Sequence, residues 1–324
     1  MRKLTMFLAA LAAIFFGCIE LSPAQTYPSR PITVVVPFAA GGTADVIARV
    51  IVERMRQSLG QPVIVENVGG AGGNIGVGRV ARATPDGYTL VSGHWGTHVV
   101  NAATYELPYD VRSSFEPIAR TANGPQLIVA KNAMPANDLT GFIAWLKAHP
   151  DIALQGIASG SSQVNGVLFQ KMTGTRSQFV PYRGIAPALQ DLIAGQIDMM
   201  MTSVGDLLPQ VRAGTIKAYA IAAKKRSAIA PDIPTVDEAG LPGFHTQQWH
   251  ALWAPAHTPK QIVAKLNAAV VNALADPLVR QRLAELGQDI PPREEQTPEA
   301  LGTFHKAEIE KWWPIIKEAN IKVE

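Results

Sequence analysis

The sequence of 324 residues contains one cysteine, Cys18. A single thiol excludes a disulfide framework, a zinc site built from several cysteines and a CxxC redox pair. Charged residues are also scarce, at 17% of the chain, whereas hydrophobic residues make up 47%. This composition excludes a globally disordered chain, and the length suits two domains of ordinary size better than one small core.

The chain has no strong excess of basic residues. It contains 29 Lys and Arg residues against 26 Asp and Glu residues, and its longest basic run is Lys224-Lys225-Arg226. Binding of nucleic acid requires a stripe of basic residues on one face. We therefore expect no nucleic-acid partner.

The common enzyme motifs are missing as well. The sequence contains no Walker A, HExxH or GxSxG motif. The run Gly76-Val77-Gly78-Arg79-Val80-Ala81 fits a permissive dinucleotide-binding pattern, but it lies inside a predicted helix rather than at its start. His94 and His98 have no acidic residue between them, which favours a polar loop or helix start over a metal site. We expect no enzyme, no metal and no cofactor.

A long apolar run occurs at the N-terminus. Arg2 and Lys3 precede the apolar residues 4–19, and the small residues Ser22 and Ala24 follow. This pattern predicts a secretory signal peptide of residues 1–24, cleaved after Ala24. The run is shorter than the roughly 20 residues that a transmembrane anchor requires, and lipid attachment at Cys18 is the alternative. We therefore expect a periplasmic protein.

Strand and helix patterns alternate along the rest of the chain. The β-branched residues 31–36 predict a buried strand, a glycine-rich turn follows, and an amphipathic helix begins at Gly42 or Thr43. The same rhythm continues to residue 222. It predicts an α/β fold of two mainly parallel sheets flanked by helices. Strands are expected at residues 31–36, 62–66, 88–92, 127–130, 153–158, 179–181, 197–201 and 218–222, and helices at 43–55, 75–83, 139–149, 163–173, 186–194, 207–213, 259–275, 277–286 and 298–317.

The last three predicted helices have no strands of their own, so they must pack on a domain formed earlier. This implies a chain that leaves the first domain, builds the second and returns. We predict a first domain from residues 25–124 and 231–324 and a second from residues 125–230. The hinge crossings are expected near Gly124-Pro125 and Ala230-Pro231.

Two strand-to-helix turns are candidates for binding an anion. The turn Phe38-Ala39-Ala40-Gly41-Gly42-Thr43 lies where free backbone N–H groups and the helix dipole favour negative charge. The turn Gly160-Ser161-Ser162, with Asn165, occupies the same setting in the other half. Tight turning by the glycines and N-capping by the serines are the alternatives. Two such turns could close on one anionic ligand from opposite sides.

Several single residues are further candidates, each with a structural alternative. Asp45 could orient the first turn or only favour the start of its helix. Arg183 could form a bidentate pair with a carboxylate or lie on the surface and pair with Asp191. Trp95 and Trp249 could wall a pocket or pack in the core.

Several motifs together resemble one family, the Bug-type receptors, which are extracytoplasmic solute-binding proteins of tripartite tricarboxylate transporters. The resemblance covers essentially the whole chain after the signal peptide. The matching motifs are Tyr27-Pro28-Ser29-Arg30-Pro31-Ile32, Pro37-Phe38-Ala39-Ala40-Gly41-Gly42-Thr43-Ala44-Asp45, Val65-Glu66-Asn67, Gly70-Ala71-Gly72-Gly73, Thr84-Pro85-Asp86-Gly87-Tyr88-Thr89-Leu90, Thr97-His98 with Asn101, Val180-Pro181-Tyr182-Arg183-Gly184, Asp191-Leu192-Ile193-Ala194-Gly195-Gln196-Ile197-Asp198, and Ala254-Pro255 before Thr258-Pro259.

The resemblance implies a two-domain periplasmic-binding-protein (Venus flytrap) fold that captures a carboxylate between its domains and delivers it to the permease subunits of the transporter. It implies capture by the loops around residues 37–43 and 160–165, partly through ordered waters. We expect a monomer. The expected ligand-binding residues are Phe38, Ala39, Ala40, Gly41, Gly42, Thr43, Asp45, Trp95, Thr97, Gly160, Ser161, Ser162, Asn165, Arg183 and Trp249.

The aromatic candidates Phe38, Trp95 and Trp249 favour a large or aromatic carboxylate, such as the phthalate-type diacid terephthalate. One alternative function is a secreted hydrolase or isomerase, which would need a catalytic base that the sequence does not supply. Another is a sensory receptor that uses the same cleft and hands its closed form to a signalling partner.

Overall fold

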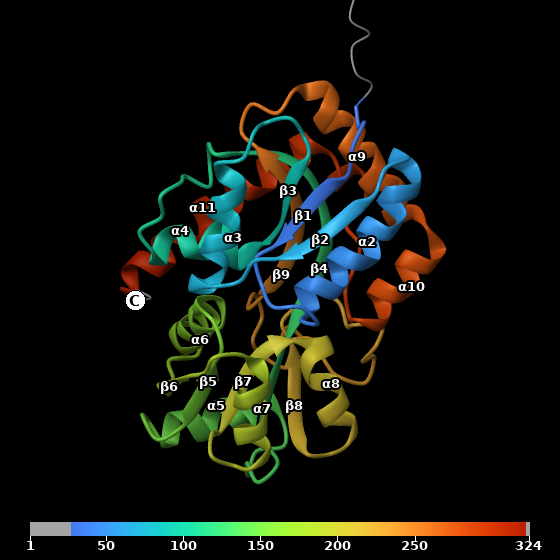
Figure 1. Ribbon diagram of the computed structural model, residues 1–324. Helices are drawn as coiled ribbons and strands as arrows, with labels where there is room; N and C mark the ends of the chain where they lie inside the picture. The colour runs from blue at the N-terminus through green and yellow to red at the C-terminus, as the bar shows by residue number, and fades with distance from the viewer. Residues whose placement is uncertain (1–26, 322–324) are drawn as a thin grey trace, which may run out of the picture.

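The computed structural model describes residues 27–321 and shows two lobes, one above the other in Figure 1. The predicted signal peptide and Cys18 lie outside the described residues. The long strand β4 (Phe115–Lys131) runs from one lobe into the other. The described residues form one sheet of nine strands, in which eight follow the order β2-β1-β3-β9-β4-β7-β5-β6 and the ninth, β8, pairs with β4 off this path.

Lobe 1 is built on the first part of β4 and four other strands. Strand β1 pairs in parallel with β2 and β3, whereas β9 is antiparallel to β3 and β4. Its strands are β1 (Ile32–Val36), β2 (Val63–Asn67), β3 (Thr89–His94) and β9 (Gln247–Pro255), and its helices are α2 (Thr43–Leu59), η1 (Ala71–Gly73), α3 (Asn74–Ala81), η2 (Gly96–Val100), α4 (Asn101–Thr104), α9 (Lys260–Ala275), α10 (Pro277–Glu285), η3 (Arg293–Glu295) and α11 (Pro298–Glu318).

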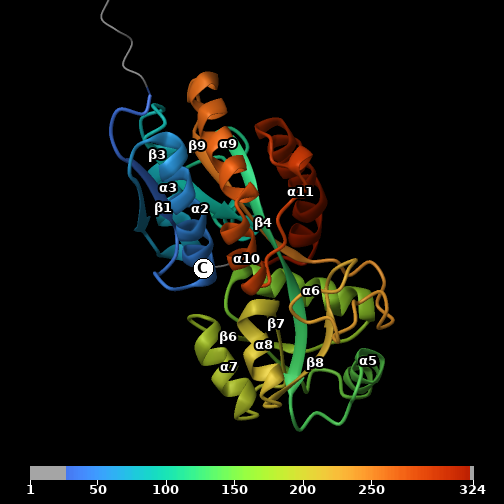
Figure 2. The same cartoon turned by 90° about the vertical axis from the view of Figure 1, so that its right-hand side faces the viewer.

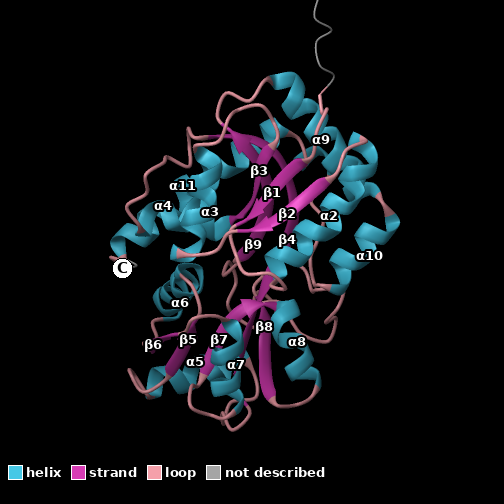
Figure 3. Cartoon of the chain, in the orientation of Figure 1, coloured by secondary structure: helices cyan, strands magenta, loops and turns pink. Residues whose placement is uncertain are grey.

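Lobe 2 is built on the last part of β4. Strand β5 pairs in parallel with β6 and β7, and β7 and β8 flank β4 in antiparallel pairing. Its other elements are α5 (Leu139–Ala148), β5 (Leu154–Ile157), α6 (Gly160–Thr173), β6 (Gln178–Pro181), α7 (Ile185–Ile193), β7 (Met199–Ser203), α8 (Val204–Arg212) and β8 (Ile216–Ile221). Figures 2 and 3 show helices on both faces of the strands in each lobe.

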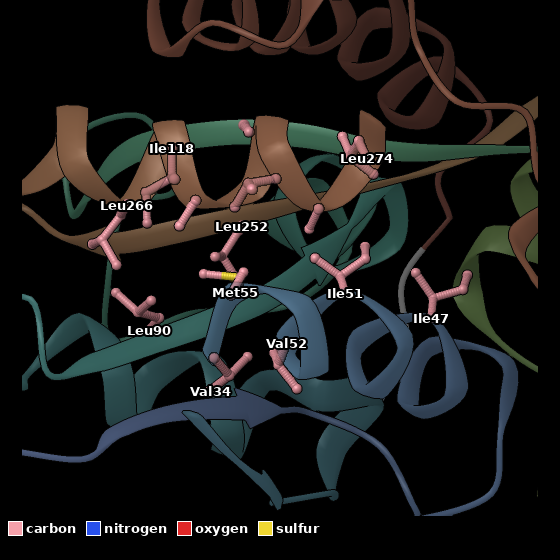
Figure 4. Packing of buried hydrophobic residues seen from close by; sticks show 14 of the residues in the cluster. Val34, Ile47, Ile51, Val52, Met55, Leu90, Ile118, Leu252, Leu266 and Leu274 are labelled. Atoms are coloured by element: carbon pink, nitrogen blue, oxygen red, sulfur yellow. The ribbon is translucent and has the colours of Figure 1, made fainter. Parts of the chain in front are cut away.

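Helix α2 illustrates why these residues form this fold. Ile47, Ile51 and Met55 recur every four residues, so they share one face of the helix, and all are buried. Gly60 ends the helix in a left-handed conformation (φ 66°) that glycine adopts without strain. In Figure 4 Ile51 and Met55 point toward Leu252 of β9 and toward α9. Burying each such side chain contributes about 1.5–3 kcal/mol.

Each lobe has a hydrophobic cluster on both faces of its strands. In β1, Val34 belongs to the cluster under α2 and α9, whereas its neighbour Val35 belongs to the cluster under α3 and α11. This alternation follows from the opposite directions of successive side chains in a strand. In lobe 2, the neighbouring residues Leu127 and Ile128 of β4 likewise belong to two different clusters. Parallel strands covered on both faces are the expected α/β arrangement, and the predicted fold class is confirmed.

Among the described residues, no single helix is long and apolar enough to cross a membrane. Helices α9 and α10 reach the required length and hydropathy only together, across a bend of 73°.

Two strand predictions need correction. Strand β9 was not predicted, so the C-terminal helices do have a strand from their own part of the chain. Strand β4 was predicted only from Leu127, but it begins at Phe115. Pro117 and Gly124-Pro125 weaken the strand pattern, and the register shifts in the pairing with β9 show how the sheet accommodates the irregular part. The two predicted sheets are consequently joined through β4.

The chain returns to lobe 1 later than the sequence analysis placed it. Ala230 and Ile233 pack in one cluster of lobe 2, and Phe244 packs in the other. The chain returns to lobe 1 at Gln247, the first residue of β9, which pairs with Pro125 of β4. Residues near 288 also reach this region, because Asn123 and Asp289 exchange backbone hydrogen bonds of 2.8 Å.

Candidate functional site

A cavity of about 550 Å³ lies between the lobes. The carboxyl ends of β1 and β3 from lobe 1 and of β5, β6 and β7 from lobe 2 approach it, and the helices that follow begin at its wall. Ligands of open α/β sheets bind at this edge. We call this cavity the cleft. It is lined by Phe38, Thr43, Ala44, Gly72, His94, Gly96, Asn101, Tyr105, Gln126, Gly156, Ile157, Ala158, Ser159, Gly160, Ser161, Ser162, Gln163, Pro181, Tyr182, Gly184, Ile185, Met200, Met201, Thr202, Ser203, Asp206, Gln248 and His250.

Helix N-termini from both lobes point backbone donors at the cleft. Thr43 and Ala44 form the first turn of α2, whose N-cap Gly42 provides no side-chain cap. In α6 the Ser159 side chain accepts from the amide of Ser162, and Gly160 and Ser161 are further first-turn residues at the cleft. First-turn N–H groups have no acceptor within the helix and carry the positive end of its dipole. The cleft therefore has backbone donors on opposite sides, an arrangement that can bind an anion.

Asp45 holds the turn before α2 in place. Its side chain is buried and accepts hydrogen bonds from the amide of Gly41 (2.8 Å), from Asn67 Nδ2 (2.9 Å) and from Arg49 Nε (2.9 Å). Burial alone would raise the pKa of Asp45, but the hydrogen bonds from Arg49, Gly41 and Asn67 lower it. Asn67 also donates to the carbonyl oxygen of Phe38 (3.0 Å). Asp45 thus orients the turn without lining the cleft.

Two neutral histidines line the cleft where β3 and β9 pair. His94 and His250 are directly opposite each other, with ring centroids 5.7 Å apart. The His94 ring also stacks on Phe38 at 4.7 Å. Desolvation lowers the pKa of His94 to about 3 and that of His250 to about 4. Both are therefore uncharged at neutral pH and provide no cation.

His94 and His98 do not form a shared site. His98 is fully buried and stacks on Trp253 at 4.8 Å, away from the cleft residues. Residues 27–321 contain no group of three or more His, Cys, Asp or Glu side chains that could hold a metal ion.

The lobes are connected across the cleft by a hydrogen bond between α2 and α8. Thr43 Oγ1 donates to Asp206 Oδ1 at 2.9 Å. Thr202 Oγ1 donates to the other oxygen, Oδ2, at 3.3 Å. Burial raises the pKa of Asp206.

Five of the predicted site residues line the cleft: Phe38, Thr43, Gly160, Ser161 and Ser162. They come from both predicted turns, so the structure brings the two turns together across the lobes. Ala39, Ala40, Gly41 and Gly42 belong to the first turn but do not line the cavity.

The remaining predicted residues lie elsewhere. Thr97 is buried and exchanges hydrogen bonds with the backbone of His94 (3.0 Å). Asn165 is fully buried in α6, and neither polar atom of its amide has a hydrogen-bond partner among the described residues. Arg183 is exposed, and Tyr182 rather than Arg183 donates to Asp191 (2.7 Å).

Trp95 and Trp249 lie in the core, each 1% exposed. Trp95 packs edge-on against Trp312 at 4.9 Å, and Trp249 Nε1 donates to Glu308 at 3.0 Å. Neither lines the cleft. Their position matches the packing role that was the alternative in the sequence analysis.

Several lining residues were not predicted from the sequence, above all His250 and Asp206. His250 lies in the strand that was not predicted. Asp206 follows the predicted strand at residues 197–201 and lies in the first turn of α8. Its place after a strand, at a helix start, is the same signal that identified Thr43 and Ser161.

Comparisons with known proteins give one consistent result. The sequence profile of the family described as "Tripartite tricarboxylate transporter family receptor" matches residues 47–321. The structure of MatC (Rpa3494) from Rhodopseudomonas palustris with bound malate is 42% identical, has a TM-score of 0.81, and the match covers 90% of this chain and 100% of that chain. The periplasmic binding protein BugD is 38% identical (TM-score 0.81; 92% and 100% covered). R. palustris Rpa4515 with adipate is 32% identical (TM-score 0.82; 91% and 99% covered).

Proposed function

Because the chain belongs to the tripartite tricarboxylate transporter receptor family, we propose that it captures an organic carboxylate in the cleft and delivers it to the permease of such a transporter. The family assignment confirms the prediction of a solute-binding receptor rather than an enzyme. A secreted hydrolase or isomerase is therefore not proposed.

The observation that carries this proposal is the pair of helix N-termini that meet at the cleft from opposite lobes. Thr43 and Ala44 of α2 and Gly160 and Ser161 of α6 provide neutral donors, and the described lining contains no Lys or Arg. A helix N-terminus stabilises an anion by typically 0.3–1 kcal/mol, and by up to about 2 kcal/mol in a partly buried site. The solved relatives MatC and Rpa4515 hold malate and adipate, which are both dicarboxylates.

Closure of the lobes would couple binding to transport. The hinge would use β4 at Gly124-Pro125 and the return to β9 at Gln247. A ligand shifts an open–closed equilibrium only by its differential affinity for the closed form. Donors from both lobes give the closed form its higher affinity for the ligand, because they reach one ligand together only when the lobes are close. A sensory receptor would use the same chemistry, and capture of its partner would distinguish the two roles.

The size of the ligand is a separate part of the proposal. Of the three aromatic residues that suggested terephthalate, Phe38 lines the cleft and the two tryptophans do not. Tyr105 and Tyr182 add two further aromatic side chains. An aromatic diacid therefore remains one class to test beside the aliphatic acids.

A thermal-shift screen against aliphatic and aromatic mono-, di- and tricarboxylates tests the function. A ligand at 100 times its dissociation constant should stabilise the protein by about 2.7 kcal/mol. Ser161→Ala removes a cleft hydroxyl and should reduce the shift. Ser113→Ala changes an exposed serine of lobe 1 outside the cleft and should leave the shift unchanged. No stabilisation by any carboxylate would contradict the proposal.

We also propose export to the periplasm after cleavage of residues 1–24. The relative BugD is described as a periplasmic binding protein. N-terminal sequencing of the protein recovered from the periplasmic fraction should begin at Gln25. A chain found in the cytoplasmic fraction with its first 24 residues intact would contradict this.

A further inference from the structure

Asp206 is the only residue with a formal charge among the described residues that line the cleft. The other titratable side chains of the lining are neutral at pH 7. Burial lowers the pKa of His94 and His250 to about 3 and about 4, and burial raises the pKa of Tyr105 and Tyr182 above its ordinary value. The cleft therefore has one carboxyl group, whose pKa burial raises, and no positive charge in its described lining.

The Asp206 carboxylate lies beside the donors of α2. Its Oδ1 is 2.9 Å from Thr43 Oγ1, and Thr43 belongs to the first turn of that helix. Thr202 donates to Oδ2 at 3.3 Å. A carboxylate offers about four lone-pair positions. Two of them are used by these threonines, and the described residues provide no third hydrogen bond to Asp206, although its side chain lines the cavity.

This position decides which ligand group fits next to a bound carboxylate. A ligand carboxylate held by the amides of Thr43 and Ala44 comes to lie close to Asp206. Two neighbouring carboxylates repel each other, and a partly buried site strengthens the repulsion. An O–H or N–H group on the ligand between them would instead donate to Asp206, and hydrogen bonds to charged acceptors are among the stronger ones.

We propose that Asp206 selects carboxylates that carry a hydrogen-bond donor, a hydroxyl or an ammonium group, on the carbon next to the carboxylate. The inference rests on the proposed function, in which the cleft binds a carboxylate at the start of α2. Asp206 accepts the hydrogen bond from that donor and disfavours plain diacids. A role limited to joining the lobes through Thr43 would instead affect all carboxylates equally.

The test measures the affinities of the purified protein for succinate, malate and aspartate by titration calorimetry at pH 7.5. These acids share a four-carbon diacid chain and differ in having no donor, a hydroxyl or an ammonium group. We expect malate, aspartate or both to bind about 10- to 100-fold more tightly than succinate, the range for a hydrogen bond to a charged group. The acid that gains affinity identifies the donor as a hydroxyl or an ammonium.

Asp206→Asn keeps an oxygen that can accept from Thr43 but removes the charge. In this variant the preference over succinate should fall below about threefold, and succinate itself should bind more tightly. Asp232→Asn changes an exposed aspartate outside the cleft and should keep the full preference. Asp206→Ser serves as the second neutral variant if Asp206→Asn does not fold.

The possible failures are distinguishable. If succinate, malate and aspartate bind equally, or if the neutral variants keep the preference, the role of Asp206 is overturned while carboxylate binding stands. If neither these acids nor any other carboxylate binds, the proposed function fails and the role of Asp206 fails with it.

Discussion

Lowering the pH from 7 to 5 should destabilise the folded protein by about 4 kcal/mol through two histidines of the cleft. His94 and His250 are 9% and 3% exposed. Desolvation lowers the pKa of His94 to about 3 and that of His250 to about 4. In the unfolded chain a histidine has a pKa of about 6.5. Between these values the unfolded chain binds protons that the folded protein does not, so stability falls as the pH falls.

The magnitude follows from proton linkage. From pH 7 to pH 5 each histidine that stays neutral in the fold costs about 2 kcal/mol, because each pKa unit corresponds to about 1.4 kcal/mol. His98, whose pKa burial also lowers, acts in the same direction. Asp206 and Asp289 act in the opposite direction, since burial raises the pKa of both carboxyl groups and acidification then favours the fold. A substitution of one histidine therefore measures the contribution of that histidine to the pH dependence of stability.

Urea unfolding at pH 7 and pH 5, followed by tryptophan fluorescence, measures the difference in the free energy of unfolding between the two pH values. His94→Asn keeps a side-chain acceptor for the amide of Thr97, which donates to His94 Nδ1 at 3.3 Å. This variant should reduce the difference by about 2 kcal/mol. His257→Gln changes an exposed side chain in the loop between β9 and α9 and should not alter this difference. The reasoning would be refuted if the free energy of unfolding of the wild type fell by less than about 1 kcal/mol from pH 7 to pH 5. It would also be refuted if this fall were as large in His94→Asn as in the wild type.

Two further predictions concern Asp45, which positions the turn before α2, and Gly96, which lines the cleft. Asp45→Ala removes the acceptor that holds the amide of Gly41 and Asn67, so it should cost about 1–3 kcal/mol of stability and weaken carboxylate binding; an unchanged affinity in calorimetry would contradict its positioning role. Gly96→Ala places a methyl group 2.5 Å from Ser161 Oγ and 2.6 Å from His94 Cε1, so it should hold the lobes apart and lower the affinity by about tenfold or more. Its control, Gly302→Ala, meets nothing nearer than 3.7 Å and should bind as the wild type does.

The strand-to-helix turn at residues 38–43 was predictable because its sequence signals are local. The β-branched residues of β1 and the apolar spacing of α2 identify a strand followed by a helix, and the glycines between them mark the turn. The α6 turn carries the same kind of signal, with Ser159 as its cap. Both turns contribute residues to the lining of the cleft, and their binding of one ligand stays a prediction.

The residues that were missed depend on partners far away in the sequence. Asp206 meets Thr43 across 163 positions, and nothing in the sequence near either residue indicates this contact. His250 lies in β9, where this histidine and the two tryptophans Trp249 and Trp253 are all buried. The cluster that covers the tryptophans contains residues from both ends of the chain. A segment with glutamine, tryptophan and histidine has no clear period-2 pattern, so burial there is a property of the assembled fold.

The most direct test of the central claim is to follow the backbone amides of the ¹⁵N-labelled protein by NMR during titration with malate. If the helix N-termini hold the carboxylate, the amides of Thr43, Ala44, Gly160 and Ser161 should shift first and together, from both lobes, with one dissociation constant. Shifts confined to one lobe, or shifts elsewhere with these four amides unchanged, would contradict the account.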